Sequence, residues 1–113
     1  MSYDEIKKII DEFLSSEFQM TKFSYLEANE RYTIAESHYK ALKLPENLHF
    51  AIVDYLRSLN YAKSTDMIDY VEFEFLDGIA RHGEYFVYYY KVVTVFPHYV
   101  LFNTRVVIRR EKM

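Results

Sequence analysis

The chain has 113 residues, 50% of them hydrophobic, with 12 tyrosines, 9 phenylalanines, no cysteine and a formal net charge of −3 at pH 7. This length predicts a single domain over residues 1–113, and the lack of cysteine excludes disulfides, thiol catalysis and thiolate metal sites. No apolar run approaches the roughly 18 residues that span a bilayer, and the charged opening "MSYDEIKKII" lacks an apolar signal core, so we expect a protein that works inside a cell and away from membranes.

The first predicted element is a helix over residues 2–16. Ser2 and Glu5 have the spacing of a capping box, in which side chains satisfy free backbone groups at the start of a helix. Apolar residues with the helical period follow, namely Ile6, Ile9, Ile10, Phe13 and Leu14. One face of this helix is therefore expected to pack on a core.

Two strands, a second helix and a polar connection are predicted next. Residues 20–26 and 31–36 have strand composition, and "EANE" between them is expected to form a hairpin turn. The run that starts at Ser37 is predicted to become helical, with Pro45 in a first turn and an apolar stripe that ends near Asn60. The polar segment "AKSTDM" is then expected to be a connection.

The remainder is predicted to be an antiparallel meander. "DYVEFEFL" alternates apolar and polar residues like a strand, and "DGIARHG", which contains both glycines, is expected to form a loop. Pro97 separates two long strands over residues 85–96 and 99–110. The predicted order is αββαβββ. We therefore expect an α+β protein with an antiparallel sheet of about five strands and two helices on one face.

Charged residues predict which face of each long strand turns away from the helices, because a charge is costly to bury without a partner. In the last strand Arg105 lies outside, so the residues expected to face the helices are Val100, Phe102, Val106 and Ile108. By the same argument Lys91 is expected to lie outside. The residues that alternate with it along the strand should share this face, namely Val87, Tyr89, Val93 and Val95. The residues of that strand expected in the core are Phe86, Tyr88, Tyr90, Val92 and Phe96.

The outer face obtained in this way is an apolar patch with a charged rim, which is typical of a protein interface. Tyrosine and arginine are frequent anchors of such interfaces. The predicted dimer or partner surface consists of Val87, Tyr89, Lys91, Val93, Val95, Leu101, Arg105 and Val107. An acidic partner surface is predicted at Asp69, Glu72 and Glu74.

Motifs that carry catalysis or bind cofactors are missing from the sequence. The four histidines form no H-x-H pair and no H-E-x-x-H zinc motif; they are His38, His49, His82 and His98. Glu72 and Glu74 share a strand face that could hold a hard cation, but a solubilising sheet face explains them better. We therefore expect no catalytic residue, no metal and no cofactor.

Three parts of the sequence carry a family resemblance. They are the opening "MSYDEIKKIIDEFLSSE", with Tyr3, Glu5, Lys8 and Asp11, the strand "DYVEFEF" and the basic ending "VVIRREK". In these parts the chain resembles a small anti-CRISPR family from viruses of hyperthermophilic Sulfolobales that inhibits subtype I-D interference. It is also similar to proteins of filamentous and rod-shaped crenarchaeal viruses.

The resemblance implies helices on a sheet, a homodimer and no enzymatic activity. It also implies binding to the large, Cas10-like subunit of the CRISPR effector in the cytoplasm of the host cell. The predicted function is therefore a non-enzymatic viral protein that inhibits this effector by protein–protein binding.

Two other functions stay open. Tyrosines on a sheet can stack single-stranded bases, so a viral nucleic-acid-binding protein that uses a Tyr/Arg-rich sheet face is the first alternative. Basic residues outnumber acidic ones only over residues 78–113, and Glu72 and Glu74 would repel phosphate, which counts against it. A small viral nuclease, with a site at a dimer interface that uses His82 or Glu84, is the second alternative.

Overall fold

The computed structural model describes residues 1–18, 32–60 and 62–110, which form two helices and five strands. In chain order the elements are α1 (Tyr3–Ser15), β1 (Tyr32–Lys43), α2 (Leu48–Ser58), β2 (Ala62–Asp66), β3 (Val71–His82), β4 (Tyr85–Val95) and β5 (Tyr99–Arg110). The strand predicted over residues 20–26 lies outside the described residues.

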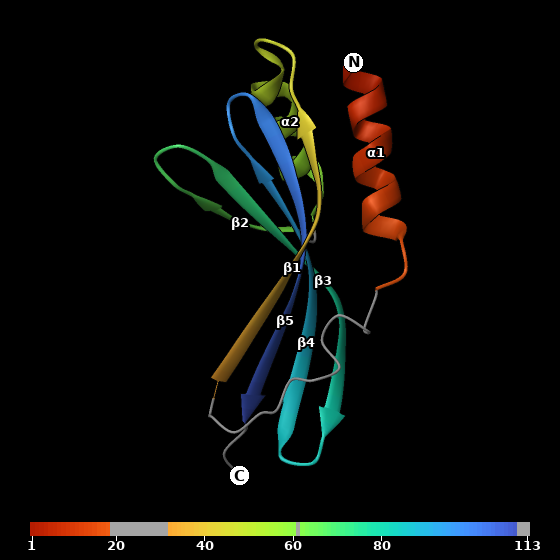
Figure 1. Cartoon of the computed structure of the whole chain (residues 1–113), viewed down its shortest axis with the longest axis vertical. Coiled ribbons are helices and arrows are strands. Elements are labelled where there is room, and N and C mark those ends of the chain that lie inside the picture. Colours follow the sequence, from red (N-terminus) through yellow and green to blue (C-terminus); the bar gives the residue numbers. More distant parts are fainter. Residues whose placement is uncertain (19–31, 61, 111–113) are drawn as a thin grey trace.

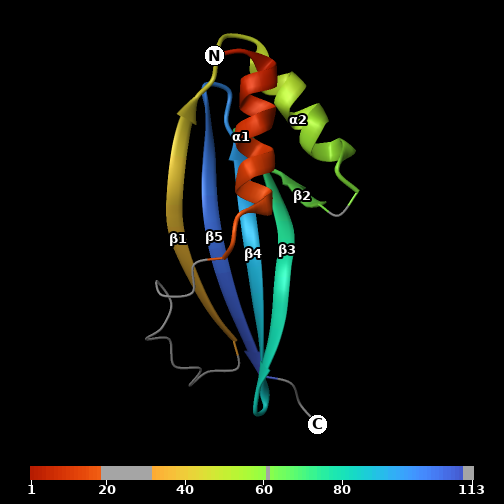
Figure 2. The ribbon, with the colours of Figure 1, turned by 90° about the vertical axis from the view of Figure 1, so that its right-hand side faces the viewer.

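The five strands form one antiparallel sheet in the order β1-β5-β4-β3-β2 (Figure 1). Both helices lie on the same face of the sheet and cover the half that contains the β4–β5 turn (Figure 2). The predicted fold class, α+β with two helices on one face of an antiparallel sheet, is confirmed. We call the face under the helices the helix face, the opposite one the open face, and the half that ends at the β3–β4 turn the far half.

Helix α1 begins and packs as its sequence predicts. The backbone N–H of Glu5 donates to the Ser2 side chain over 3.2 Å, and the Ser2 hydroxyl donates to the Glu5 carboxylate, which confirms the capping interaction. The side of α1 that faces the sheet buries Ile6, Ile10 and Phe13. Each such burial contributes roughly 1.5–3 kcal/mol, so this face holds α1 on the sheet.

Helix α2 lies beside α1 and is joined to it by a polar contact. It buries Ile52, Val53 and Leu56. The Tyr55 hydroxyl donates a hydrogen bond to the Asp11 carboxylate on α1. The two helices therefore form one layer over the sheet.

The predicted boundary between the first strands and α2 is wrong. The run from Ser37 was expected to lead into a helix with Pro45 in its first turn, but residues 37–43 continue β1 as far as Lys43, which lies opposite Tyr99 of β5. Helix α2 begins only at Leu48, so Pro45 precedes the helix instead of occupying its first turn. The reason is tertiary, because a long β1 satisfies the backbone groups of a long β5, and this outweighs local helix propensity.

Two segments that were expected to be connections are strands. The polar run Ala62–Asp66 forms the edge strand β2 and pairs with Val71–Phe75; polar side chains suit an edge, which water contacts. The segment "DGIARHG" continues β3 to His82, and only Gly83 and Glu84 form the turn. Gly83 has a φ of 61°, which glycine adopts without a steric penalty.

The core lies between the two helices and the helix face of the sheet. Phe73, Val93 and Phe102 form one row across three strands and are fully buried. Other strand residues in this cluster are Leu42, Phe75, Val95 and Val100. Val106 and Ile108 lie on the same face, so the orientation predicted for the last strand is confirmed.

The orientation predicted for β4 is wrong. Because Val93 stands in the core row, its whole alternating set lies on the helix face; this set is Val87, Tyr89, Lys91, Val93 and Val95. These five residues were expected to form most of the outer partner surface. The set expected in the core lies on the open face instead, namely Phe86, Tyr88, Tyr90 and Val92.

Lys91 is the cause of this error, because its side chain is only 2% exposed although it carries a charge. The ammonium donates hydrogen bonds to the backbone carbonyls of Leu14 and Ser16, at the end of α1. Carbonyls at the C-terminal end of a helix lack partners within the helix and carry the negative end of its dipole. A lysine beneath this end of the helix is therefore stabilised in the core.

A bulge in β3 completes the surroundings of Lys91. The pairing of β3 with β4 changes register between Leu76 and Gly78, so Asp77 is the extra residue. The Asp77 carboxylate lies 3.4 Å from the Lys91 ammonium. Carbonyl and carboxylate oxygens together offset the cost of removing this charge from water.

The helix face continues into the far half as a second, smaller apolar cluster. Val87, Val106 and Ile108 are buried there. Phe18, which follows α1, meets the ring of Tyr89 edge to face at 5.1 Å. Burial raises the pKa of the Tyr89 phenol, in keeping with a position on the inner face.

Candidate functional site

The open face is the first candidate surface, because both helices of the described chain pack on the opposite side (Figure 2). The predicted partner residues that do lie on this face are Leu101, Arg105, Val107, Glu72 and Glu74, but Val107 is buried. Asp69 belongs to the β2–β3 turn instead. The structure therefore brings together only part of the predicted surface.

Arg105 is the centre of an ion-pair network on the open face. Its Nε lies 2.7 Å from the Glu36 carboxylate on β1, and one terminal nitrogen lies 2.8 Å from Glu72 on β3. The other terminal nitrogen donates to Glu74. Since β4 separates β5 from β3, the guanidinium reaches across β4, where Val92 stands opposite Glu74 and is fully buried.

This network places three carboxylates around one guanidinium, so it is locally acidic. Burial by itself lowers the pKa of Arg105, but hydrogen bonds and charge from Glu72 and Glu36 outweigh burial and hold this pKa above the ordinary arginine value. All three guanidinium nitrogens of Arg105 thus contact carboxylates of this chain. These contacts join β5 to β1 and β3.

The far half of the open face carries a row of rings that we call the aromatic ladder, formed by Phe86, Tyr88 and Tyr90 of β4. Successive ring centroids lie 6.5 Å apart. The guanidinium of Arg81 lies 5.2 Å from the Phe86 centroid, and that of Arg109 lies 5.7 Å from the Tyr88 centroid. Sequence reasoning missed the ladder because it assigned these rings to the core.

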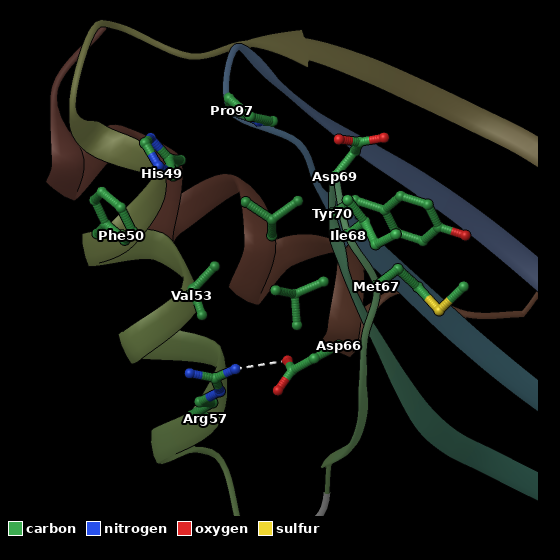
Figure 3. A pocket seen from close by; sticks show the side chains of 12 residues that line it. His49, Phe50, Val53, Arg57, Asp66, Met67, Ile68, Asp69, Tyr70 and Pro97 are labelled. Atoms are coloured by element: carbon green, nitrogen blue, oxygen red, sulfur yellow. Dashed lines mark hydrogen bonds and ion pairs between the residues drawn. The ribbon is translucent and has the colours of Figure 1, made fainter.

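The second candidate surface is a groove of about 300 Å³ between α2 and the β2–β3 hairpin (Figure 3). Its lining includes buried Val53 of α2 and Val95 of β4, together with Tyr70 of the β2–β3 turn. At one end Arg57 of α2 forms an ion pair with Asp66 of β2, over 2.7 Å (Figure 3). The groove therefore depends on packing between segments that are separate in the sequence.

Three large apolar side chains are exposed along this groove. Phe50 on α2 is 69% exposed, Met67 is 51% exposed, and Ile68 in the turn is fully exposed. Nδ1 of His49, which also lines the groove, is buried and has no hydrogen-bond partner among the described residues. The adjacent Met67 and Ile68 at the end of a polar segment were the only sequence signal for this site.

Residues 1–18, 32–60 and 62–110 contain no group of three His, Asp or Glu side chains that could hold a metal ion. The nuclease candidates His82 and Glu84 are exposed at the β3–β4 turn, where Glu84 pairs with Arg110 at 2.6 Å. Among the described residues, neither helix has the length and apolar character that crossing a bilayer requires.

Comparison with known proteins gives no match to a family model, to a curated protein or to a solved structure. The two candidate surfaces of the described chain are therefore the groove beside α2 and the open face.

Proposed function

We propose that this chain is a non-enzymatic viral protein that inhibits a host CRISPR–Cas effector by binding one of its subunits. The observation that supports this proposal is the groove, where Phe50, Met67 and Ile68 together expose apolar surface. Partner binding would remove this surface from water, which is favourable in proportion to its area. The sequence resemblance supplies the partner, the large, Cas10-like subunit of a subtype I-D effector in the host cytoplasm.

The groove is better suited to a protein segment than to a small ligand. Its volume of about 300 Å³ is at the lower end of small-molecule pockets, which span roughly 300–1,000 Å³. The apolar lining can accept an apolar anchor, and Asp69, exposed at its edge, can pair with a neighbouring basic residue. We therefore expect the partner segment to present an apolar side chain beside a lysine or arginine.

Replacing Ile68 with aspartate is expected to weaken binding to the purified large subunit about tenfold or more and to relieve inhibition of target cleavage. The substitution puts a charge where an apolar contact would be desolvated, a loss typical of interface anchors. Since Ile68 is fully exposed, stability should change by less than about 0.5 kcal/mol. Biolayer interferometry and a cleavage assay with reconstituted effector measure the two effects.

Ile79→Asp is the matched control, because Ile79 is also exposed, at 55%, but lies on β3 away from the groove. This variant should bind the effector as the parent protein does. Equal affinity of the Ile68→Asp and Ile79→Asp variants, or no binding of the parent protein to any effector subunit, would refute the proposal.

The proposal includes the homodimer that the resemblance implies. Size-exclusion chromatography with light scattering should give twice the mass of one chain at the concentrations used for effector binding. The mass of a single chain would remove the dimer from the proposal and leave the effector-binding test unaffected.

A further inference from the structure

We infer that the far half of the open face binds single-stranded nucleic acid, with bases stacked on the aromatic ladder and phosphates paired with Arg81 and Arg109. This site is separate from the groove, because the ladder lies on the half of the sheet that the helices leave uncovered, whereas the groove adjoins α2.

The ladder has the geometry that base stacking requires. Phe86, Tyr88 and Tyr90 are alternate residues of β4, so their side chains leave the same face in a row. Each ring is partly exposed. Every base has a π-face, so stacking on such rings tolerates any sequence. Unpaired bases are accessible in single strands and not in duplexes, which favours a single-stranded ligand.

The charge around the ladder suits a phosphate backbone. Arg81 on β3 and Arg109 on β5 stand opposite Phe86 in the register, one on each side of it. Both arginines are exposed. The nearby Glu84 carboxylate is already engaged by Arg110. A strand that follows the ladder would therefore meet cationic groups on both sides.

The acidic network limits the length of the site. Arg105 stands opposite Tyr90 in the register, and the glutamates around it begin where the ladder ends. Repulsion from these carboxylates should stop a nucleic acid there. We expect a short footprint of about three nucleotides, one for each ring.

Fluorescence anisotropy with labelled oligothymidylate and oligouridylate tests this inference, with a duplex of equal length as a third probe. The parent protein should bind one or both single strands at low salt and the duplex more weakly. Two phosphate contacts predict that log K falls with log salt with a slope of about −1.4. The two single-stranded probes separate a preference for DNA from a preference for RNA.

Variants locate the site. Tyr88→Ala should weaken binding about 5- to 150-fold, the range measured for loss of one stacked base, whereas Tyr88→Phe keeps a ring and should retain most affinity. Arg109→Ala should make the salt slope shallower by about 0.7, equivalent to one phosphate contact. Circular dichroism should show an unchanged fold for each variant.

Tyr99→Ala and Ile68→Asp are the controls and should bind oligonucleotides as the parent does. Tyr99 is also an exposed tyrosine, at 40%, but it stands next to the β4–β5 turn. No binding at the lowest salt, equal binding of duplex, or unchanged affinity of a folded Tyr88→Ala variant would overturn the inference. Loss of effector binding in Tyr88→Ala, without oligonucleotide binding by the parent, would assign the ladder to a protein partner instead.

Discussion

Replacing Lys91 with methionine is expected to lower the free energy of unfolding by about 3 kcal/mol. Methionine keeps the length and apolar stem of lysine but removes the ammonium that donates to Leu14 and Ser16 and pairs with Asp77. Because the Lys91 side chain is only 2% exposed, water cannot readily replace the lost donor, and the oxygens pay their desolvation cost without compensation. Urea denaturation followed by circular dichroism measures the difference.

The loss of stability in the Lys91→Met variant should be concentrated at the end of α1, which Lys91 holds on the sheet. Amide hydrogen exchange around Leu14 should therefore accelerate more than exchange in the core strands. A second variant, Asp77→Asn, combined with Lys91→Met should cost less than the sum of the single changes, since the two groups interact.

Lys63→Met is the matched control, because Lys63 is exposed on the edge strand β2. It should change stability by less than about 0.5 kcal/mol. If Lys91→Met has an effect as small as Lys63→Met, then the hydrogen bonds to α1 do not hold the helix in place.

Replacing Arg105 with methionine is expected to lower the free energy of unfolding by about 2 kcal/mol at neutral pH and low salt. Its guanidinium joins Glu36 of β1 to Glu72 and Glu74 of β3. Without it, neighbouring carboxylates repel one another in the folded state, and dissolved salt screens this repulsion. Denaturant titrations at low and high salt measure the effect.

The salt dependence of the Arg105→Met variant follows from this repulsion. Added salt should restore part of the lost stability by screening the carboxylates. A loss in the free energy of unfolding that is independent of salt would show that lost packing, and not charge, accounts for it.

Two substitutions serve as comparisons for Arg105. Arg105→Lys keeps a positive charge but not the planar group that reaches carboxylates on two sides. Its free energy of unfolding should therefore lie between those of the parent protein and the Arg105→Met variant. Arg57→Met removes an exposed ion pair with Asp66, which is expected to contribute less than about 1 kcal/mol.

Elements with strong local signals were predicted correctly. The capping residues and the apolar stripe of α1 are local, and the structure shows the expected contacts. The last strand was also oriented correctly, because its alternation between apolar residues and arginines is unambiguous. By contrast, β2 and the second part of β3 have weak strand composition, and pairing with neighbouring strands decides their conformation.

The candidate sites were less predictable than the fold. The groove exists because the β2–β3 hairpin packs beside α2, and no local pattern reveals that contact. The aromatic ladder was assigned to the core because Lys91 was assumed to face water. The expectation that a charged residue faces water failed at Lys91. Because side chains alternate along a strand, this one error reversed the predicted orientation of every side chain of β4.

Local sequence patterns were enough to predict the α+β class, the first helix and the residues of β5 on the helix face. Periodic apolar residues and capping groups act over only a few positions, so they can be recognised in the sequence. Which face of β4 is buried was decided only by tertiary structure. The end of α1 and the bulge at Asp77 bring oxygens from distant parts of the chain to Lys91. A buried charge is tolerated only where such partners converge, and that convergence placed Phe86, Tyr88 and Tyr90 on the open face.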